Sequence, residues 1–265
     1  MVNAVITGST KGIGYALSRE LVRRGHAVVV TGRTQEAVDE AVGKLGGEAA
    51  AGGRAVGHVV DVTEAEAVQG LWDAAVAELG RVDLWINNAG VAYTMRTVVE
   101  TTPEEVETMV RTNMLGTIYG AQVALRGMSA NGGGKLFNVL GGGSDGRLRP
   151  GMGVYSTTKR GLDMFTKALV KEAEGTAVTV GQIRPGILIT DGWLREAATS
   201  PESVSSQRKM LNILADHVDD VAPYLMDRVL ASTKNGEEVS WLTTGRMMKK
   251  FMGGAKQDKL ARYGL

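Results

Sequence analysis

Cysteine is absent from this sequence of 265 residues, and histidine occurs only three times. Without cysteine the chain cannot form a disulfide scaffold, a cysteine nucleophile or a cysteine metal site. The histidines, His26, His58 and His217, show no H-x-x-x-H spacing, so we expect no metal site and structural or solvent-facing roles. A net charge of +1 argues against nucleic acid as the main partner.

Long apolar runs are also missing, and none approaches the length that a membrane span needs. The chain opens on a strand-like run, V-N-A-V-I-T, with no signal-peptide pattern. We therefore expect a soluble, cytoplasmic protein with no transmembrane segment. The length and the hydrophobic share of 43% predict one domain over residues 1–265.

Short β-branched runs alternate with helical patterns along the chain. The expected strands are Asn3–Thr7, Ala27–Thr31, Ala55–Val60, Asp83–Ile86, Lys135–Leu140, Ala177–Ile183 and Glu237–Thr243. The expected helices are Gly12–Arg24, Thr34–Lys44, Glu64–Leu79, Pro103–Met128 and Val154–Glu172, with turns at Gly46–Gly53 and Asn131–Gly134. Thr102, Pro103 and Glu105 form a helix-start signal. This alternation predicts an α/β fold, a doubly wound domain with a parallel seven-stranded sheet and helices on both faces.

A glycine-rich turn, T-G-S-T-K-G-I-G, leads from the first strand into the first helix. Glycines let the backbone approach a pyrophosphate, and the helix N-terminus supplies free N–H groups. We therefore expect dinucleotide binding by Gly8, Ser9, Thr10, Lys11, Gly12, Ile13 and Gly14.

Cofactor choice is expected at the end of the second strand, where an NAD enzyme carries an acid that binds the ribose 2′-hydroxyl. Here the sequence reads Thr31-Gly32-Arg33-Thr34, with no acid, and Lys11 lies in the glycine turn. Two cations near a 2′-phosphate favour NADP(H). The alternative is that both are ordinary surface cations.

Tyr155 and Lys159 lie four residues apart, on one face of an expected helix. A nearby ammonium favours the phenolate and lowers the pKa of a tyrosine towards working pH, as a general acid or base requires. The pair alone would usually serve packing and solubility. Here the nucleotide-binding turn upstream favours a catalytic role for the pair.

These motifs, with Asp61-Val62, Asn87-Asn88-Ala89-Gly90, Asn113 and Pro185–Thr190, resemble the short-chain dehydrogenase/reductase family over residues 1–192. The resemblance implies a Rossmann fold in which Asp61 and Val62 contact the adenine and Asn88, Ala89 and Gly90 line the cofactor. It implies that Tyr155 donates a proton, Lys159 also binds the nicotinamide ribose, and Asn113 holds a water behind Lys159. Pro185, Gly186, Leu188 and Thr190 would lie at the nicotinamide end.

One departure concerns the serine that the family usually carries about thirteen residues before the tyrosine. That position is Gly142, and the nearest serine is Ser144. Either Ser144 reaches the same point and is catalytic, or backbone N–H groups of the glycine loop take over part of its role. A third alternative makes Ser144 only a turn residue.

The glycine-rich loop that carries Ser144 resembles the loop of the chlorophyll(ide) b reductase branch. The similarity extends through Met210–Leu214 and Trp241–Thr243. The resemblance implies NADPH-dependent reduction of a C7 formyl group on a chlorin to hydroxymethyl. Two alternatives stay open: a reductase of 3-oxoacyl thioesters or small ketones and aldehydes, and a non-catalytic NADP(H)-binding scaffold.

Two segments lie outside these motifs. Residues 191–217, with Trp193, Leu194 and Leu211, are expected to form a substrate lid, or to pack their apolar side chains on the protein body. Residues 246–265 form a basic tail with six cations and one acid, suited to an anionic surface or a neighbouring subunit. We expect a homodimer or homotetramer.

Overall fold

The computed structural model describes residues 1–147, 150–254 and 258–263 of the chain. Its strands are β1 (Asn3–Ile6), β2 (Ala27–Gly32), β3 (Arg54–Val59), β4 (Leu84–Asn87), β5 (Gly134–Val139), β6 (Val178–Arg184), β7 (Leu188–Ile189), β8 (Asp216–His217) and β9 (Glu237–Ser240). Its α-helices are α1 (Gly12–Arg23), α2 (Gln35–Gly47), α3 (Ala65–Leu79), α4 (Pro103–Met109), α5 (Gly116–Ala130), α6 (Gly153–Glu172), α7 (Asp191–Thr199), α8 (Pro201–Leu214), α9 (Val218–Ala231) and α10 (Thr244–Gly253). A π-helix, η1 (Val110–Leu115), and a 3₁₀ turn, η2 (Ala261–Tyr263), complete the set.

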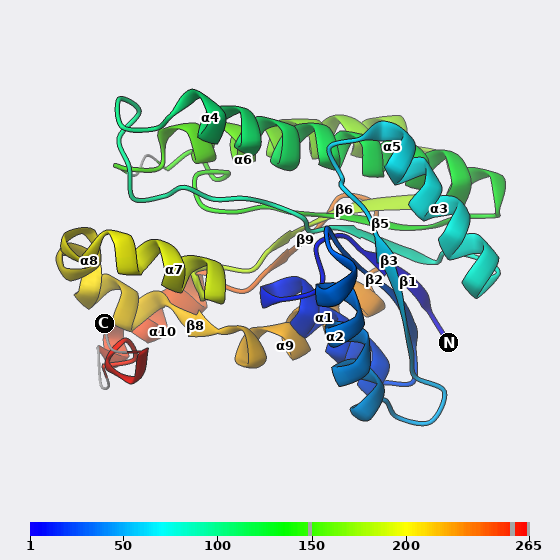
Figure 1. Ribbon diagram of the computed structural model, residues 1–265, viewed down its shortest axis with the longest axis horizontal. Helices are drawn as coiled ribbons and strands as arrows, with labels where there is room; N and C mark the ends of the chain where they lie inside the picture. The colour runs from blue at the N-terminus through cyan, green and yellow to red at the C-terminus, as the bar shows by residue number, and fades with distance from the viewer. Residues whose placement is uncertain (148–149, 255–257, 264–265) are drawn as a thin grey trace.

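Seven parallel strands form the main sheet in the order β3-β2-β1-β4-β5-β6-β9. The order reverses between β1 and β4, which makes this the point where ligands bind in doubly wound folds. Figure 1 shows α3, α4, α5 and α6 on one side of the sheet and α1, α2 and α9 on the other. The predicted fold class is therefore confirmed.

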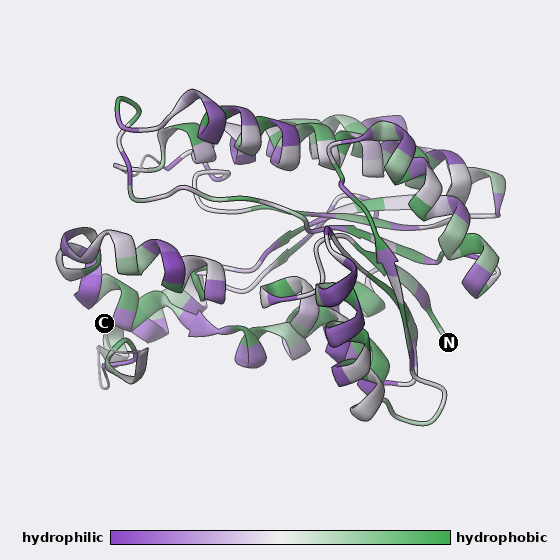
Figure 2. Cartoon of the chain, in the orientation of Figure 1, coloured by the Kyte–Doolittle hydropathy of each residue, from purple (hydrophilic) through white to green (hydrophobic). Residues whose placement is uncertain are grey.

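Burial on both faces explains why the central strands read as continuous apolar runs. In β2, Val28 and Val30 pack towards α1 and α9 with Leu21 and Leu225, while Val29 lies in the opposite core, which contains Trp72. Figure 2 shows hydrophilic and hydrophobic residues alternating around the helices, as expected for helices that bury one face.

The helix predicted at Pro103–Met128 starts as expected but is not one regular helix. Thr102 and Glu105 form the predicted capping box, with Pro103 in the first turn. The helix then passes through the π-turn η1 before continuing as α5 to Ala130. A π-turn inserts an extra residue into a helix and often marks a functional site.

The predicted lid contains two helices, α7 and α8. β7 precedes them and β8 follows them, and the two strands pair in a short parallel sheet that was not predicted. Figure 1 shows this unit beyond one end of the main sheet, with α10 beside α8. None of the helices in the described part of the chain has the length and hydropathy of a membrane span.

Candidate active site

The glycine-rich turn between β1 and α1 holds Gly8 and Gly12 in the left-handed region, with φ of +63° and +59°. A Cβ atom on Gly8 would lie 2.8 Å from Ala89 Cα, so any side chain there would separate the turn from the segment after β4. Around Gly12 such an atom would meet only Thr190, at 3.9 Å. The turn thus combines close backbone packing with open space at the N-terminus of α1.

Two buried hydroxyl groups fix this turn. Ser9 Oγ donates to Ile6 O at 2.7 Å and accepts from Thr31 N at 2.9 Å, and Thr31 Oγ1 accepts from Gly8 N at 2.9 Å. Both side chains have no exposed surface. The structure therefore gives Ser9, a predicted cofactor contact, a supporting place beneath the turn instead.

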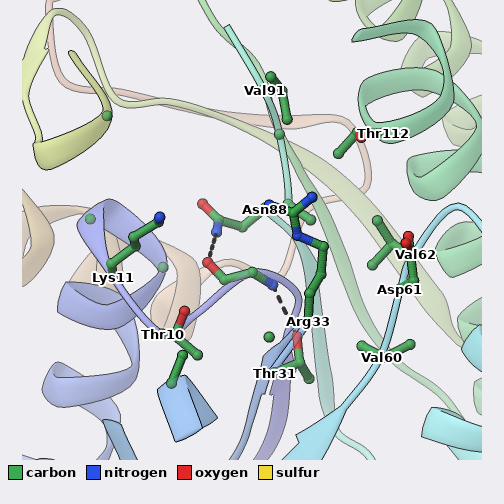
Figure 3. A pocket seen from close by; sticks show the side chains of 18 of the residues that line it. Thr10, Lys11, Thr31, Arg33, Val60, Asp61, Val62, Asn88, Val91 and Thr112 are labelled. Atoms are coloured by element: carbon green, nitrogen blue, oxygen red, sulfur yellow. Dashed lines mark hydrogen bonds between the residues drawn. The ribbon is translucent and has the colours of Figure 1, made fainter. Parts of the chain in front are cut away.

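Asn88 connects the turn to β4 (Figure 3). Its Nδ2 donates to Thr7 O at 2.8 Å and to Gly8 O at 3.0 Å, and its backbone N–H donates to Thr7 Oγ1 at 2.9 Å. Its Oδ1 is buried and has no hydrogen-bond partner among the described residues. A buried acceptor left unpaired costs about 1–3 kcal/mol, so a ligand that donates a hydrogen bond here would relieve that cost.

A cavity of about 630 Å³ lies over this turn, and two cations line it. Lys11 and Arg33 are both exposed, and Figure 3 shows their side chains extending from the glycine turn and from the end of β2. The carboxylates in the described part of the wall are Asp61 and Asp191. Asp61 belongs to the segment after β3, so no described acid occupies the end of β2.

The cavity gathers most of the predicted cofactor contacts. In its wall are Gly8, Thr10, Lys11, Gly12, Ile13, Gly14, Arg33, Asp61, Val62, Asn88, Ala89, Gly90 and Thr190. The described wall does not include Ser9, Tyr155, Lys159, Pro185, Gly186 or Leu188. Three further wall residues were not predicted: Val91, which directly follows Gly90, and Arg111 and Thr112, which lie in the π-turn η1.

Lys159 projects from α6 into the protein rather than into water. It is 5% exposed, its Nζ donates to Val139 O at 3.1 Å, and the ammonium lies 6.0 Å from the centre of the Tyr155 ring. Burial lowers the pKa of Lys159 to about 8, because removing water disfavours the charged form. Among the described residues Lys159 forms no salt bridge, so no carboxylate there offsets the desolvation.

Asn113 lies in the π-turn η1 and is fully buried. Its Nδ2 donates to Val91 O at 2.9 Å and to Thr158 Oγ1 at 3.0 Å, and its Oδ1 accepts from Val91 N at 2.8 Å. A Cβ atom on Gly90 would lie 3.2 Å from Asn113 Oδ1 and 3.6 Å from Lys159 Nζ. The fold thus brings Asn113 and Lys159 to the same glycine. The water predicted at Asn113 stays a prediction.

Gly141, after β5, lies against the Tyr155 hydroxyl. A Cβ atom there would overlap the hydroxyl oxygen and lie 3.0 Å from the ring Cζ. Counting thirteen residues back from the tyrosine gave Gly142, but the position that faces the hydroxyl is Gly141. Only a residue without a side chain leaves Tyr155 in this place.

Ser144 is 1% exposed, and both roles of its hydroxyl are filled within the protein. Its Oγ donates to Gly141 O at 2.6 Å and accepts from the guanidinium of Arg184. These contacts favour the alternatives in which Ser144 does not touch substrate.

The segment after β6 carries the predicted nicotinamide-end residues. Gly186 has φ of +82° and packs under Trp241 and Leu242. Thr190 caps α7 by accepting from Trp193 N at 3.2 Å. Thr190 reaches the cavity wall, so the start of the lid borders the cofactor cavity.

The lid and the basic tail pack on each other. Leu211 of α8 is 5% exposed and lies in one cluster with Leu260 of the tail. Asp216 accepts from Lys250 Nζ at 2.6 Å and from Trp241 Nε1 at 2.6 Å, and Lys259 Nζ lies 3.4 Å away. Three predicted tail cations, Arg246, Lys250 and Lys259, are thus engaged within the chain, rather than left for another surface. Lys256 and residues 264–265 lie outside the described residues.

Comparisons with known proteins identify the family to which this chain is similar. Residues 2–200 match the short chain dehydrogenase family. The chain is 36% identical to "Probable chlorophyll(ide) b reductase", chloroplastic, of Arabidopsis thaliana over 93% of its own length and 51% of that protein. It is 39% identical to a chloroplastic chlorophyll(ide) b reductase of Oryza sativa subsp. japonica over 88% of its own length and 68% of that protein. The chain thus spans about half the length of the first relative and about two thirds of the second.

Solved structures give the same family. A short-chain type dehydrogenase/reductase from Mycobacterium ulcerans superposes with a TM-score of 0.82 at 27% identity, covering 93% of this chain and 90% of that one. A serine dehydrogenase in complex with NADP⁺ superposes with a TM-score of 0.78 at 26% identity, covering 91% and 95%. Together with the cofactor cavity and the buried lysine beside the tyrosine, these matches support nicotinamide-cofactor binding. The chain belongs to the short-chain dehydrogenase/reductase family.

Proposed function

We propose that this protein is an NADPH-dependent carbonyl reductase whose substrate is the C7 formyl group of chlorophyll(ide) b or a related pigment. The observation that carries the chemistry is the buried Lys159 ammonium, 6.0 Å from the centre of the Tyr155 ring and close to Gly90. Gly90 lies in the wall of the cavity that Lys11 and Arg33 also line. The pigment assignment is supported by relatives of that name, whose similarity covers 88–93% of this chain.

The cavity suits NADPH better than NADH. A 2′-phosphate at the end of β2 would meet Arg33, whose guanidinium can bind it bidentately, and Lys11. Gly12 leaves room for the pyrophosphate at the N-terminus of α1, and Asn88 Oδ1 offers an unpaired acceptor. When bound, NADPH supplies a hydride.

The chain's own groups would handle the proton and the developing charge. Tyr155 gives its hydroxyl proton to the substrate oxygen as that oxygen gains charge. Lys159 places a positive charge near the phenolate that forms, and Asn113 helps to anchor the segment beside it. Backbone N–H groups of the glycine loop, in place of Ser144, assist Tyr155 in stabilising the alkoxide.

A reductase of 3-oxoacyl thioesters or small ketones and aldehydes is the second candidate, because a relative of 32% identity is named NADP-dependent 3-hydroxy acid dehydrogenase, and the reverse of that reaction reduces a 3-oxo group. That match covers only 69% of this chain, less than the 88% or more of the pigment reductases. A non-catalytic scaffold is the third candidate, and the assembled Tyr155–Lys159 pair counts against it.

The test is to incubate the pure protein with NADPH and, separately, chlorophyllide b, a 3-oxoacyl thioester and a small aldehyde. The proposal expects faster turnover of the formyl pigment, measured as the hydroxymethyl product by chromatography and as loss of NADPH absorbance. Turnover of small carbonyls with no reaction of the pigment would refute the substrate and leave the reductase. No turnover of any carbonyl, with intact NADPH binding, would favour the scaffold. A cytoplasmic location and a homodimer or homotetramer stay predictions, and light scattering after size exclusion tests the latter.

A further inference from the structure

Arg184, the last residue of β6, binds three groups at once with one guanidinium. Its Nη1 donates to Ser144 Oγ, its Nη2 to Asp163 Oδ1 at 2.7 Å, and its Nε to Glu238 Oε2 at 3.0 Å. The side chain is only 19% exposed. It thereby joins β6 to α6, to β9 and to the loop after β5.

Asp163 anchors the guanidinium from α6. Its side chain is 2% exposed and pairs with Arg160 at 3.1 Å, Lys167 at 2.7 Å and Arg184 at 2.7 Å. Removing one partner from a buried charge is costly because it leaves the other charge uncompensated. Asp163 therefore holds Arg184 in a fixed place relative to the helix that carries Tyr155.

The same network of hydrogen bonds holds the glycine loop after β5 in place. Arg184 binds Ser144 Oγ, and that hydroxyl donates to Gly141 O at 2.6 Å. Arg160 holds the loop a second time by donating to Ser144 O at 2.9 Å. Gly141 in turn lies against the Tyr155 hydroxyl. The chain of contacts thus runs from Asp163, through the guanidinium and Ser144, to the glycine that faces the proton donor.

The direction of one backbone donor follows from this chain of contacts. The peptide bonds of the described residues are all trans, so the N–H of Gly142 points opposite to the carbonyl of Gly141. Because Ser144 holds that carbonyl, it also sets the direction of the Gly142 N–H, away from the buried serine. In the described part of the chain this N–H has no hydrogen-bond partner.

We propose that Ser144 and Arg184 are positioning residues, which fix the Gly141–Gly142 peptide relative to Tyr155 and act on the reaction only through it. The proposal rests on the proposed reductase function. It explains why a serine near the usual catalytic position is buried, with its hydroxyl both donating and accepting a hydrogen bond within the protein. The two residues form one unit, because the hydroxyl that holds Gly141 is itself held by the guanidinium.

A double-mutant cycle tests this unit. In Ser144→Ala and Arg184→Met, kcat for a turned-over carbonyl should each fall roughly 10- to 100-fold, the scale of a small misplacement of catalytic groups. The double variant should be no slower than the slower single variant, because residues acting as a unit are not additive. NADPH affinity and KM should change less than about twofold. Arg228→Met, which removes an exposed salt bridge to Glu237 of β9, is the matched control and should keep its activity.

A second measurement separates this proposal from the function on which it rests. Hydrogen exchange of the peptide containing residues 140–146 should become at least about tenfold faster in Ser144→Ala and Arg184→Met, but not in Arg228→Met. This readout needs no turnover, so it stands even if no carbonyl is reduced. Unchanged exchange in both variants would overturn the proposal. A loss of 10²–10³ in Ser144→Ala with near-normal Arg184→Met would also overturn it, because Ser144 would then contact substrate.

Discussion

Lys159 should make the unfolding free energy of this protein rise with pH in the alkaline range. The folded-state pKa of Lys159 is about 8, below the ordinary lysine value, because the ammonium is buried. Between pH 8 and about 10.5 the unfolded chain therefore binds more protons at this position than the folded chain does. A state that binds fewer protons gains stability as protons become scarce. The folded state is thus favoured as pH rises through this window, and below pH 8 the contribution is constant.

The size of the effect follows from the same pKa. A lowering from 10.5 to about 8 corresponds to about 3 kcal/mol of desolvation cost at neutral pH, at about 1.4 kcal/mol for each pKa unit. Most of this cost, roughly 2–3 kcal/mol, should disappear between pH 7 and pH 10. In Lys159→Met the cost is absent at every pH. The stability difference between the unchanged protein and the variant should therefore change by that amount.

Urea unfolding at pH 6, 7, 8, 9 and 10 measures this difference, since other titrating groups cancel between the two proteins. Lys171→Met is the matched control, because Lys171 lies on the same helix and is 77% exposed. Its difference curve should not rise with pH. If the curve for Lys159→Met is also flat between pH 7 and pH 10, the ammonium is well solvated and the argument from burial is wrong.

Three further predictions concern the cofactor, the proton donor and the lid. In Arg33→Ala, NADPH binding should weaken by roughly 1.5–3 kcal/mol, the scale of a lost charged hydrogen bond, while NADH binding stays nearly unchanged; fluorescence titration measures both, and equal losses would contradict the 2′-phosphate contact. In Tyr155→Phe, turnover should fall at least ~100-fold with NADPH binding intact; near-normal turnover would mean that the proton comes from elsewhere. Glu196 of α7 accepts hydrogen bonds from Thr94 Oγ1 at 2.8 Å and Met95 N at 3.0 Å. Glu196→Ala should therefore destabilise the lid by roughly 1–3 kcal/mol and speed hydrogen exchange in residues 92–97; unchanged exchange would show that this contact does not hold the lid.

The parts of the fold that the sequence could predict are those governed by local rules. Alternating strand and helix patterns located the seven strands of the sheet, and Thr102, Pro103 and Glu105 predicted the start of α4. A capping box involves residues three apart, so it is legible in a short stretch. The π-turn η1 was missed, because it depends on how Asn113 packs against Val91 and Thr158, not on a local pattern.

The position of the glycine that faces Tyr155 shows the limit of counting along the chain. A spacing rule taken from the family led to Gly142, whereas Gly141 faces Tyr155. The rule assumes a loop of fixed shape, and this loop is held by Ser144 and Arg184. Arg184 is 40 residues further along the sequence than Ser144, so the pairing follows from the sheet and not from the loop. Because these contacts are long-range, the sequence could identify Ser144 as the serine nearest the usual position but could not predict its hydrogen-bond partners.

The lid illustrates a different limit, because covering a substrate and packing on the protein require the same apolar side chains. Leu211, Ile213 and Leu214 are each at most 9% exposed, so they are already used within the protein. Trp193 is half-buried, and Met210 is 37% exposed. A flat pigment would bury several hundred Å² of apolar surface, worth several kcal/mol at about 25 cal/mol per Å² before ordering costs. That surface has to come from side chains such as Trp193 and Met210, or from movement of α7 and α8 as a unit. Selectivity for a large substrate over a small carbonyl therefore depends more on where the lid lies than on how many apolar residues it contains.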